Sequence, residues 1–198
     1  MILHFLLAFS WAQTTPATKL TGDFQISGFS FGGKLSGEVY VGELDQLHFQ
    51  ILRPAGIPLI SLTYTTDEVC VWFDFDNTYY SGSPQDFTEL SSGYVPPSTL
   101  SNLMLAREQT IEGWTWHTKN NKIKRVTIGE PTLAQARYHQ WKEGSFSRIQ
   151  IDVVDSGWKL KGVVKETMQT TWDFQCIVPE GAVKLPLQDM RNSIPPKQ

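Results

Sequence analysis

A chain of 198 residues fits one sheet-built domain, and its 40% hydrophobic and 19% charged residues exclude a disordered chain. The formal charge is −3, and no run of Lys and Arg is longer than Lys122–Arg125. The linear sequence therefore offers no polybasic segment for nucleic acid or anionic lipid, and nucleic acid is not an expected partner. The 7 Trp, 11 Phe and 6 Tyr suit both a packed core and a lipid-lined cavity.

The first twelve residues form an apolar stretch that is typical of an export signal. Such a stretch is too short to span a bilayer, and Ser10 and Ala12 place small residues where a signal peptidase cleaves. We therefore expect residues 1–12 to be a signal peptide and the mature chain to be periplasmic. The stretch lacks the usual preceding basic residue, so a true start upstream of Met1 is the alternative. Residues 13–19 are expected to be a linker and 191–198 a flexible tail.

Between these ends, short runs alternate apolar and polar residues and are separated by turn residues, as in an antiparallel meander. One face of such a strand is apolar, for example Leu47, Phe49 and Ile51, and the face carrying His48 is expected to be wet. About 11 strands must curl, so residues 20–190 are predicted to be a mainly β, curved antiparallel half-barrel closed by a small helical insert. The expected strands are Leu20–Phe29, Lys34–Val41, Asp45–Arg53, Pro58–Tyr64, Val69–Phe75, Thr78–Tyr80, Gly113–Thr118, Lys122–Ile128, Ala134–Trp141, Phe146–Val153, Trp158–Lys165 and Thr171–Val178.

Two short helical segments interrupt the strands and predict a lid over residues 83–106. Ser83 is a candidate N-cap with Pro84 at the first helical position. Pro96–Pro97 favour an extended entry before Ser98 caps the second segment, in which apolar residues recur at helical spacing. Neither segment is long enough to be stable alone, so each must lie on the sheet.

The residues that could carry catalysis do not form a recognisable set. Gly28–Gly32 matches the letters of a nucleophile elbow around Ser30, but it leads into a strand where an elbow requires a helix, so a hairpin is favoured over an esterase. His117 and His139 have no metal-ligating neighbour at the required spacing. Asp74 and Asp76 could form a carboxylate pair, although their place at a strand end favours a turn. We expect no enzyme, no metal and no cofactor.

The two cysteines, Cys70 and Cys176, each lie in an apolar alternating run. They could pair in an oxidising compartment if their strands are close. Buried free thiols are also common in protein cores. The sequence leaves both alternatives open.

The order of elements from Lys34 to Ala106 resembles the LolA/LolB-type lipoprotein carriers and insertases of the bacterial envelope, and is closest to the outer-membrane insertase branch. The likeness is carried by Gly22-Asp23-Phe24, Arg53-Pro54-Ala55-Gly56, Leu59-Ile60-Ser61-Leu62, Tyr80 and Pro96 to Leu100. The resemblance implies an incomplete β-barrel that binds acyl chains of lipids or lipoproteins and carries them toward the outer membrane. It also implies an envelope carrier or receptor protein as a partner and peripheral contact with a membrane.

The resemblance further implies a membrane or delivery loop at Ala55 and Ile57. Ala55 stands where the insertase branch has an exposed leucine, so the segment favours holding lipid over inserting it. The alternative function is a non-catalytic structural accessory of an envelope assembly, with an interior filled by its own side chains. The residues that we expect to line the lipid cavity, with plain core packing as the alternative for each, are Phe49, Ile51, Ile60, Leu62, Phe73, Leu103, Met104, Trp114, Trp116 and Trp172.

Overall fold

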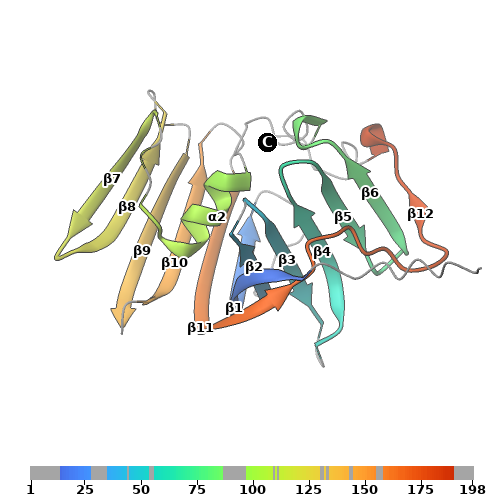
Figure 1. The fold of residues 1–198 in the computed structure, drawn as a ribbon, viewed down its shortest axis with the longest axis horizontal. Coiled ribbons are helices and arrows are strands. Elements are labelled where there is room, and N and C mark those ends of the chain that lie inside the picture. Colours follow the sequence, from blue (N-terminus) through green and yellow to red (C-terminus); the bar gives the residue numbers. More distant parts are fainter. Residues whose placement is uncertain are drawn as a thin grey trace, which may run out of the picture.

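A computed structural model describes residues 14–27, 35–43, 45–53, 56–86, 97–108, 110, 112–129, 132, 134–142, 145–154 and 158–189. Twelve strands form one sheet in the order β12-β6-β5-β4-β3-β2-β1-β11-β10-β9-β8-β7 (Figure 1). Neighbours run antiparallel except β12 and β6, which are parallel. Within the described residues β7 and β12 are the two edges, so the sheet is not closed into a barrel. The predicted mainly β class is confirmed.

Most strands begin and end within two residues of the expected positions. The tight turns use the residues that tolerate a positive φ: Asn120 and Asn121, for example, have φ of 53° and 54° between β7 and β8. The strands are β1 (Thr15–Ser27), β2 (Leu35–Gly42), β3 (Leu47–Leu52), β4 (Pro58–Tyr64), β5 (Val69–Phe73), β6 (Thr78–Gly82), β7 (Trp114–Lys119), β8 (Lys122–Ile128), β9 (Ala134–Lys142), β10 (Ser145–Val153), β11 (Trp158–Trp172) and β12 (Val183–Lys184).

The largest correction concerns the long pair that β1 and β11 form. β1 begins at Thr15, inside the segment 13–19 that was expected to be a linker, and β11 continues without a break to Trp172. The two extensions pair with each other, with Thr15 opposite Trp172. Polar residues fill this stretch and bond across the strands, as Gln169 Nε2 donates to Thr18 Oγ1 at 3.2 Å. A search for apolar alternation therefore misses it.

The helical insert is present in part among the described residues. Residues 84–86 form one helical turn in which the Asp86 amide donates to Ser83 Oγ, and the Ser83 amide to Asp86 Oδ2, both at 3.1 Å, which confirms the predicted cap. The main helix, α2 (Pro97–Leu105), begins at Pro97 instead of after it, because proline suits the first helical position. Residues 87–96 of the predicted lid lie outside the described residues.

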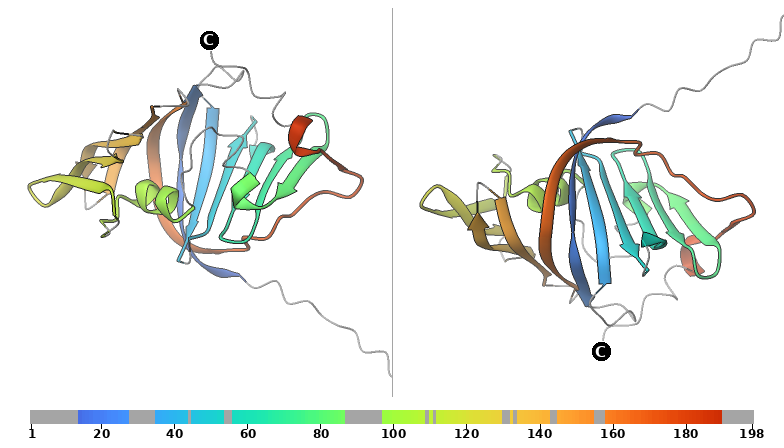
Figure 2. Two further views of the ribbon diagram at one scale, coloured as in Figure 1. Left: turned by 90° about the horizontal axis from the view of Figure 1, so that it is seen from above. Right: turned by 90° about the horizontal axis from the view of Figure 1, so that it is seen from below.

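One face of the sheet, here called the inner face, packs with α2 into the main hydrophobic core. Leu103 and Met104 of α2 are 0% and 3% exposed within it. Figure 2 shows α2 lying against one side of the sheet. Core residues contributed by the strands include Leu20, Phe24, Val39, Leu47, Ile51, Tyr64, Val69, Val126, Ala136, Tyr138 and Ile149.

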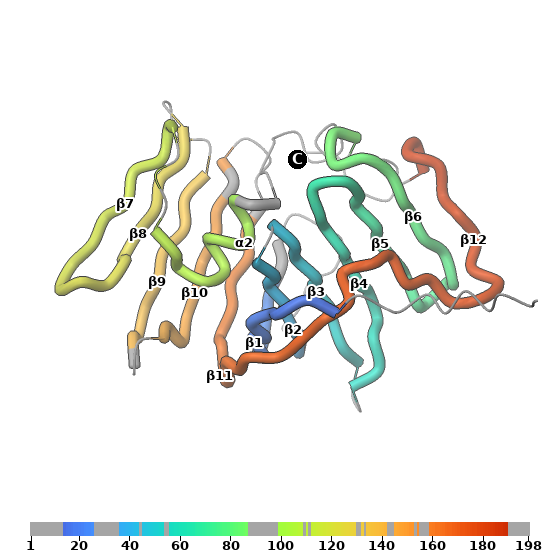
Figure 3. Tube along the Cα trace, in the orientation of Figure 1, coloured from blue at the N-terminus to red at the C-terminus, as the bar shows by residue number. Residues whose placement is uncertain are grey.

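The opposite, outer face of β2–β6 is crossed by the segment Asp173–Ala182, here called the terminal strap (Figure 3). Phe174 of the strap is buried against Ala17 and Tyr40. A disulfide joins Cys176 to Cys70 of β5, with a Cα–Cα distance of 5.6 Å. The pairing that the sequence left open is therefore present. Most of the strap was expected to belong to a strand, Thr171–Val178. Only Thr171 and Trp172 of that expected strand are extended, as the end of β11.

Candidate functional site

Nine of the ten predicted lining residues belong to the inner-face cluster. Ile51, Ile60, Leu103 and Met104 are buried there. The others are only partly buried, so the inner face keeps apolar surface that its own packing does not cover; they are Phe49, Leu62, Phe73, Trp114 and Trp116. The sequence pattern identified the strand residues of this set because their side chains point to the same face of the sheet.

The partly covered surface is extended by side chains that the sequence analysis did not select. Leu59, Trp141 and Leu160 pack against the same cluster, as do Leu100 and Leu105 of the helix. Aromatic contacts also reach across a strand: the rings of Phe24 on β1 and Phe49 on β3, on either side of β2, have centroids 5.5 Å apart and lie edge-on.

Hydrogen bonds join helix α2 to this surface. The buried Tyr138 hydroxyl donates to the Leu103 carbonyl at 2.6 Å, and Ser101 Oγ donates to the Gln46 carbonyl at 3.4 Å. Burial raises the pKa of Tyr138, which keeps its hydroxyl a donor at all ordinary pH values. Leu103 and Met104 thus form part of the inner-face core.

Trp172 is the exception among the predicted lining residues, because it lies on the outer face. Its ring stacks on Tyr40 with centroids 3.7 Å apart. The cause is a β-bulge: Glu166 and Val164 of β11 face Thr21 and Gly22 of β1, which leaves Lys165 without an opposite residue. One extra residue turns every later side chain to the other face. Alternation continued from Leu160 therefore assigns Trp172 to the wrong face.

His48 was expected on a wet face and is instead 7% exposed. It does lie on the face of β3 opposite the apolar one, but the rings of Trp172 and Tyr40 lie against it, with centroids 5.0 Å and 6.0 Å from that of His48. His48 Nδ1 and Thr63 Oγ1 share a hydrogen bond of 2.8 Å. Burial lowers its pKa to about 4, although the nearby Glu38 carboxylate opposes the shift. His48 is therefore a neutral, structural residue at pH 7.

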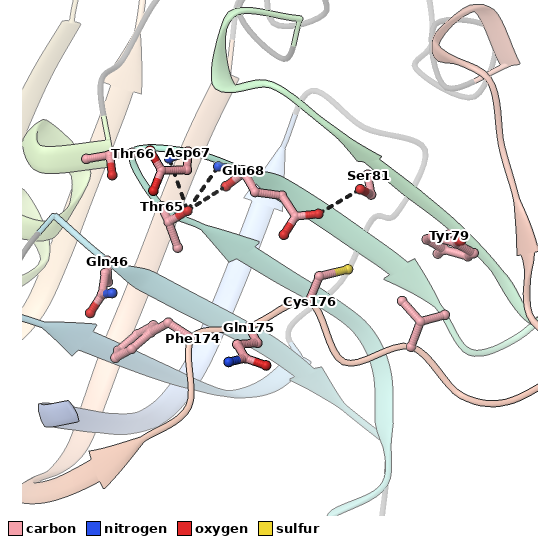
Figure 4. Close-up of a pocket in the computed structure, with 11 residues that line it drawn as sticks. Gln46, Thr65, Thr66, Asp67, Glu68, Tyr79, Ser81, Phe174, Gln175 and Cys176 are labelled. Carbon is pink, nitrogen blue, oxygen red and sulfur yellow. Dashed lines mark hydrogen bonds between the residues drawn. The ribbon is translucent and has the colours of Figure 1, made fainter. Parts of the chain in front are cut away.

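Two grooves lie on the outer face, away from the predicted lining. One, of about 680 Å³, runs beside the strap and includes Thr65, Glu68 and Ser81, whose hydroxyl donates to the Glu68 carboxylate at 2.7 Å (Figure 4). The other, of about 720 Å³, crosses β1, β11, β10 and β9. Neither contains any of the ten predicted residues.

The residues considered for catalysis are engaged in ordinary structural contacts. Asp74 forms an ion pair with Arg53 at 3.0 Å, and Asp76 accepts hydrogen bonds from the amide and hydroxyl of Thr78, as a turn residue does. His117 contacts the Arg125 guanidinium at 3.4 Å. Among the described residues no group of three metal-ligating side chains occurs, and Ser30 lies outside them.

The predicted delivery loop is described only in part. Ile57 is 53% exposed at the turn between β3 and β4, which is closed by a 2.7 Å hydrogen bond from the Arg53 amide to the Ile57 carbonyl. Ala55 lies outside the described residues, as do the predicted signal at 1–12 and tail at 191–198. No helix in the described part of the chain is long and apolar enough to span a bilayer.

Comparison with known proteins shows a distant structural similarity only. No protein-family model and no curated protein matches the sequence. A LolA superfamily protein from Nitrosomonas europaea is 11% identical, with a TM-score of 0.46 over 76% of this chain and 84% of that chain. A putative outer membrane lipoprotein-sorting protein domain from Vibrio parahaemolyticus is 8% identical, with a TM-score of 0.47 over 78% and 85%. A DUF1329 family protein from Desulfovibrio piger is 8% identical, with a TM-score of 0.48 over 78% and 85%.

Proposed function

We propose that this protein binds the acyl chains of lipids or lipoproteins against its inner face and carries them toward the outer membrane. The observation that supports this most is the set of large apolar side chains left partly exposed on the inner face, including Phe49, Phe73 and Trp116. Exposed apolar surface gathered on one concave side of a soluble fold marks a ligand or partner site. An acyl chain is the ligand that needs area and no polar partner.

The strength of such binding decides how the cargo can leave. Burying about 14 methylenes at roughly 0.8 kcal/mol each gives on the order of 11 kcal/mol. That free energy is too large to lose to water, but it nearly cancels when the chain passes to another apolar site. The cargo therefore moves directly between two cavities or from a cavity to a bilayer, with an envelope carrier or receptor as partner.

Helix α2 is the gate in this proposal. Leu103 and Met104 are buried in the inner-face core, so an acyl chain that enters this part of the core must displace them. The helix has nine residues and is too short to be stable away from the sheet. A ligand that replaces its buried contacts shifts the population toward an open state.

The place of action is an oxidising compartment, which the Cys70–Cys176 disulfide supports. We propose the periplasm, with delivery at the outer membrane through the loop of Ala55 and Ile57. The exposed Ile57 side chain supports that role for the loop. This assigns the chain to the insertase-like side of the family that its sequence resembles, with holding of lipid as the stronger activity.

The experiment is displacement of a fluorescent fatty acid by phospholipid, in wild type and two matched variants. Leu62→Asn places an amide on the inner face, and Val163→Asn places one on the outer face of β11, where Val163 is 38% exposed. We expect saturable binding that Leu62→Asn weakens about tenfold, since a lost apolar contact of about 1.4 kcal/mol has that effect. Equal binding by all three proteins would contradict the proposed site.

A second function, a structural accessory of an envelope assembly, is favoured by one observation. Leu103 and Met104 are buried and α2 occupies the inner face, so the chain fills its own interior. Under that alternative the protein works through its surface and takes up no lipid. Absence of lipid by mass spectrometry in the purified protein, together with absence of fatty-acid uptake, would favour it.

A further inference from the structure

Charge is distributed very unevenly along the sheet, although the chain as a whole carries only −3. Residues 114–172, which contain β7 to β11, include ten Lys or Arg and five Asp or Glu, a formal charge of +5. Residues 35–86, which contain β2 to β6, include one Arg and eight Asp or Glu, a formal charge of −7. Figure 1 shows that these two groups of strands form the opposite halves of the sheet.

Several of the positive charges in the half formed by β7 to β11 lie close together on its outer face. Arg125 of β8 lies directly opposite Arg137 of β9, which lies opposite Gln150 of β10, which in turn lies opposite Lys161 of β11. In the adjacent row Arg148 faces His139. We call Arg125, Arg137, Arg148 and Lys161 the basic patch; all four are exposed. No linear run predicts it, because the register of four strands creates it.

Among the described residues, the carboxylates nearest to the patch already have partners of their own. Two acids lie nearby, but Asp23 is paired with Lys165 at 2.8 Å. Asp152 is 8% exposed and accepts from the Gln150 amide at 2.9 Å. Like charges directly opposite each other on neighbouring strands destabilise a sheet. An anion bound outside would remove that repulsion.

The shape of the patch favours a surface as the partner. Arg148 and Lys161 line the groove of about 720 Å³ on this face, together with Asp23, Gln25, Gln150 and Val163. Val163, an apolar side chain 38% exposed, stands among the cations. Cations mixed with exposed apolar side chains suit the headgroup region of a bilayer.

A second copy of the chain is the other source of negative charge, and the fold disfavours it. The outer face of the acidic half is occupied by the terminal strap, which the Cys70–Cys176 disulfide holds in place. Two outer faces therefore cannot meet flush. The basic half carries no such cover, as the exposure of Arg137 and Lys161 shows.

We propose that the basic patch docks the protein on a membrane surface that contains anionic phospholipid. The outer face of the acidic half is disfavoured at the same surface, so docking begins at β8–β11 and orients the molecule. The docked face is opposite the inner face, which stays free to receive an acyl chain from a partner. Docking and acyl binding thus use different residues and can fail independently.

The test is co-sedimentation with vesicles of phosphatidylcholine alone and of phosphatidylcholine mixed with phosphatidylglycerol. We expect binding to the mixed vesicles only, and loss of that binding as salt is raised. The triple variant Arg125→Gln, Arg137→Gln, Lys161→Gln should bind on the order of a hundredfold more weakly, at about fivefold for each cation. Lys184→Gln, an exposed cation on β12, is the matched control and should bind like wild type.

Three results would overturn the proposal. They are equal binding to both vesicle types, unchanged binding by the triple variant, and binding that raised salt does not weaken. A concentration-dependent dimer in sedimentation without vesicles, abolished by the triple variant, would assign the patch to a second copy instead. The salt titration uses the wild-type protein, so it tests the electrostatic contact with the vesicles even if the triple variant folds poorly.

Discussion

At the level of single residues, the Gly-x-Phe segment that drew attention in the sequence has a packing explanation. The Phe24 ring lies between two glycines on the neighbouring strands, Gly37 and Gly162. A Cβ added at either glycine would come within 2.9 Å of that ring. The absence of side chains on both sides thus makes room for a large aromatic ring in the core.

Replacing Gly162 with alanine should therefore destabilise the protein. We expect a loss of about 1–3 kcal/mol in the free energy of unfolding, because an extra methyl overpacks the Phe24 ring. Urea unfolding measures it. In a Phe24→Leu background the smaller side chain should relieve most of the penalty, and an equal penalty in both backgrounds would refute the packing explanation.

His48 predicts how stability depends on pH. Its pKa falls from 6.5 to about 4 in the folded state. Below pH 6.5 His48 is therefore protonated in the unfolded chain but not in the native state, which lowers the free energy of unfolding. This destabilisation is absent above pH 6.5 and reaches about 3 kcal/mol of the free energy of unfolding by pH 4. His48→Gln should unfold with a shallower pH dependence in that window. His139→Gln, at an exposed histidine, is the control, and equal slopes for the two variants would contradict the assignment.

At the level of elements, period-two alternation located Pro58–Tyr64 and Lys122–Ile128 at their observed bounds. It succeeded where strands have one apolar face and are flanked by turn residues. It failed along β1 and β11, where Thr and Gln bond across the strands and a bulge at Lys165 reverses the faces. The burial of His48 could not be predicted either, because a segment more than a hundred residues later in the sequence covers it.

The disulfide between β5 and the terminal strap should contribute strongly to stability. It closes a loop across a sequence separation of 106, so reduction should lower the free energy of unfolding by about 2–5 kcal/mol. Urea unfolding with and without reductant measures this. The double variant Cys70→Ala, Cys176→Ala should have the lower stability already and be insensitive to reductant. A wild type that loses nothing on reduction would contradict the prediction.

The single hydrogen bond from Tyr138 to α2 should control how firmly the helix is held. Tyr138→Phe leaves the Leu103 carbonyl without its donor, at a cost of about 1–3 kcal/mol. In hydrogen exchange, the amides of residues 99–105 should exchange faster in the variant than in the wild type, and this increase should exceed any increase in the strands. Tyr40→Phe, which removes a hydroxyl on the outer face, should leave the helix unchanged.

At the level of the whole molecule, our proposals give the two faces of one sheet different tasks. The inner face gathers apolar side chains, and the outer face carries the strap on one half and the basic patch on the other. The sequence pattern located the apolar face, since alternation reveals which residues share a face. It did not reveal the basic patch, because the patch depends on strand register.

The most direct test of acyl binding at the inner face is quenching of tryptophan fluorescence by a brominated fatty acid, which acts only at contact. Trp114 and Trp116 lie on the inner face, whereas Trp172 lies beneath the strap on the outer face. We predict saturable quenching that persists in Trp172→Phe and falls in the double variant Trp114→Phe, Trp116→Phe. Quenching that is absent, or that disappears with Trp172 alone, would contradict the proposed cavity.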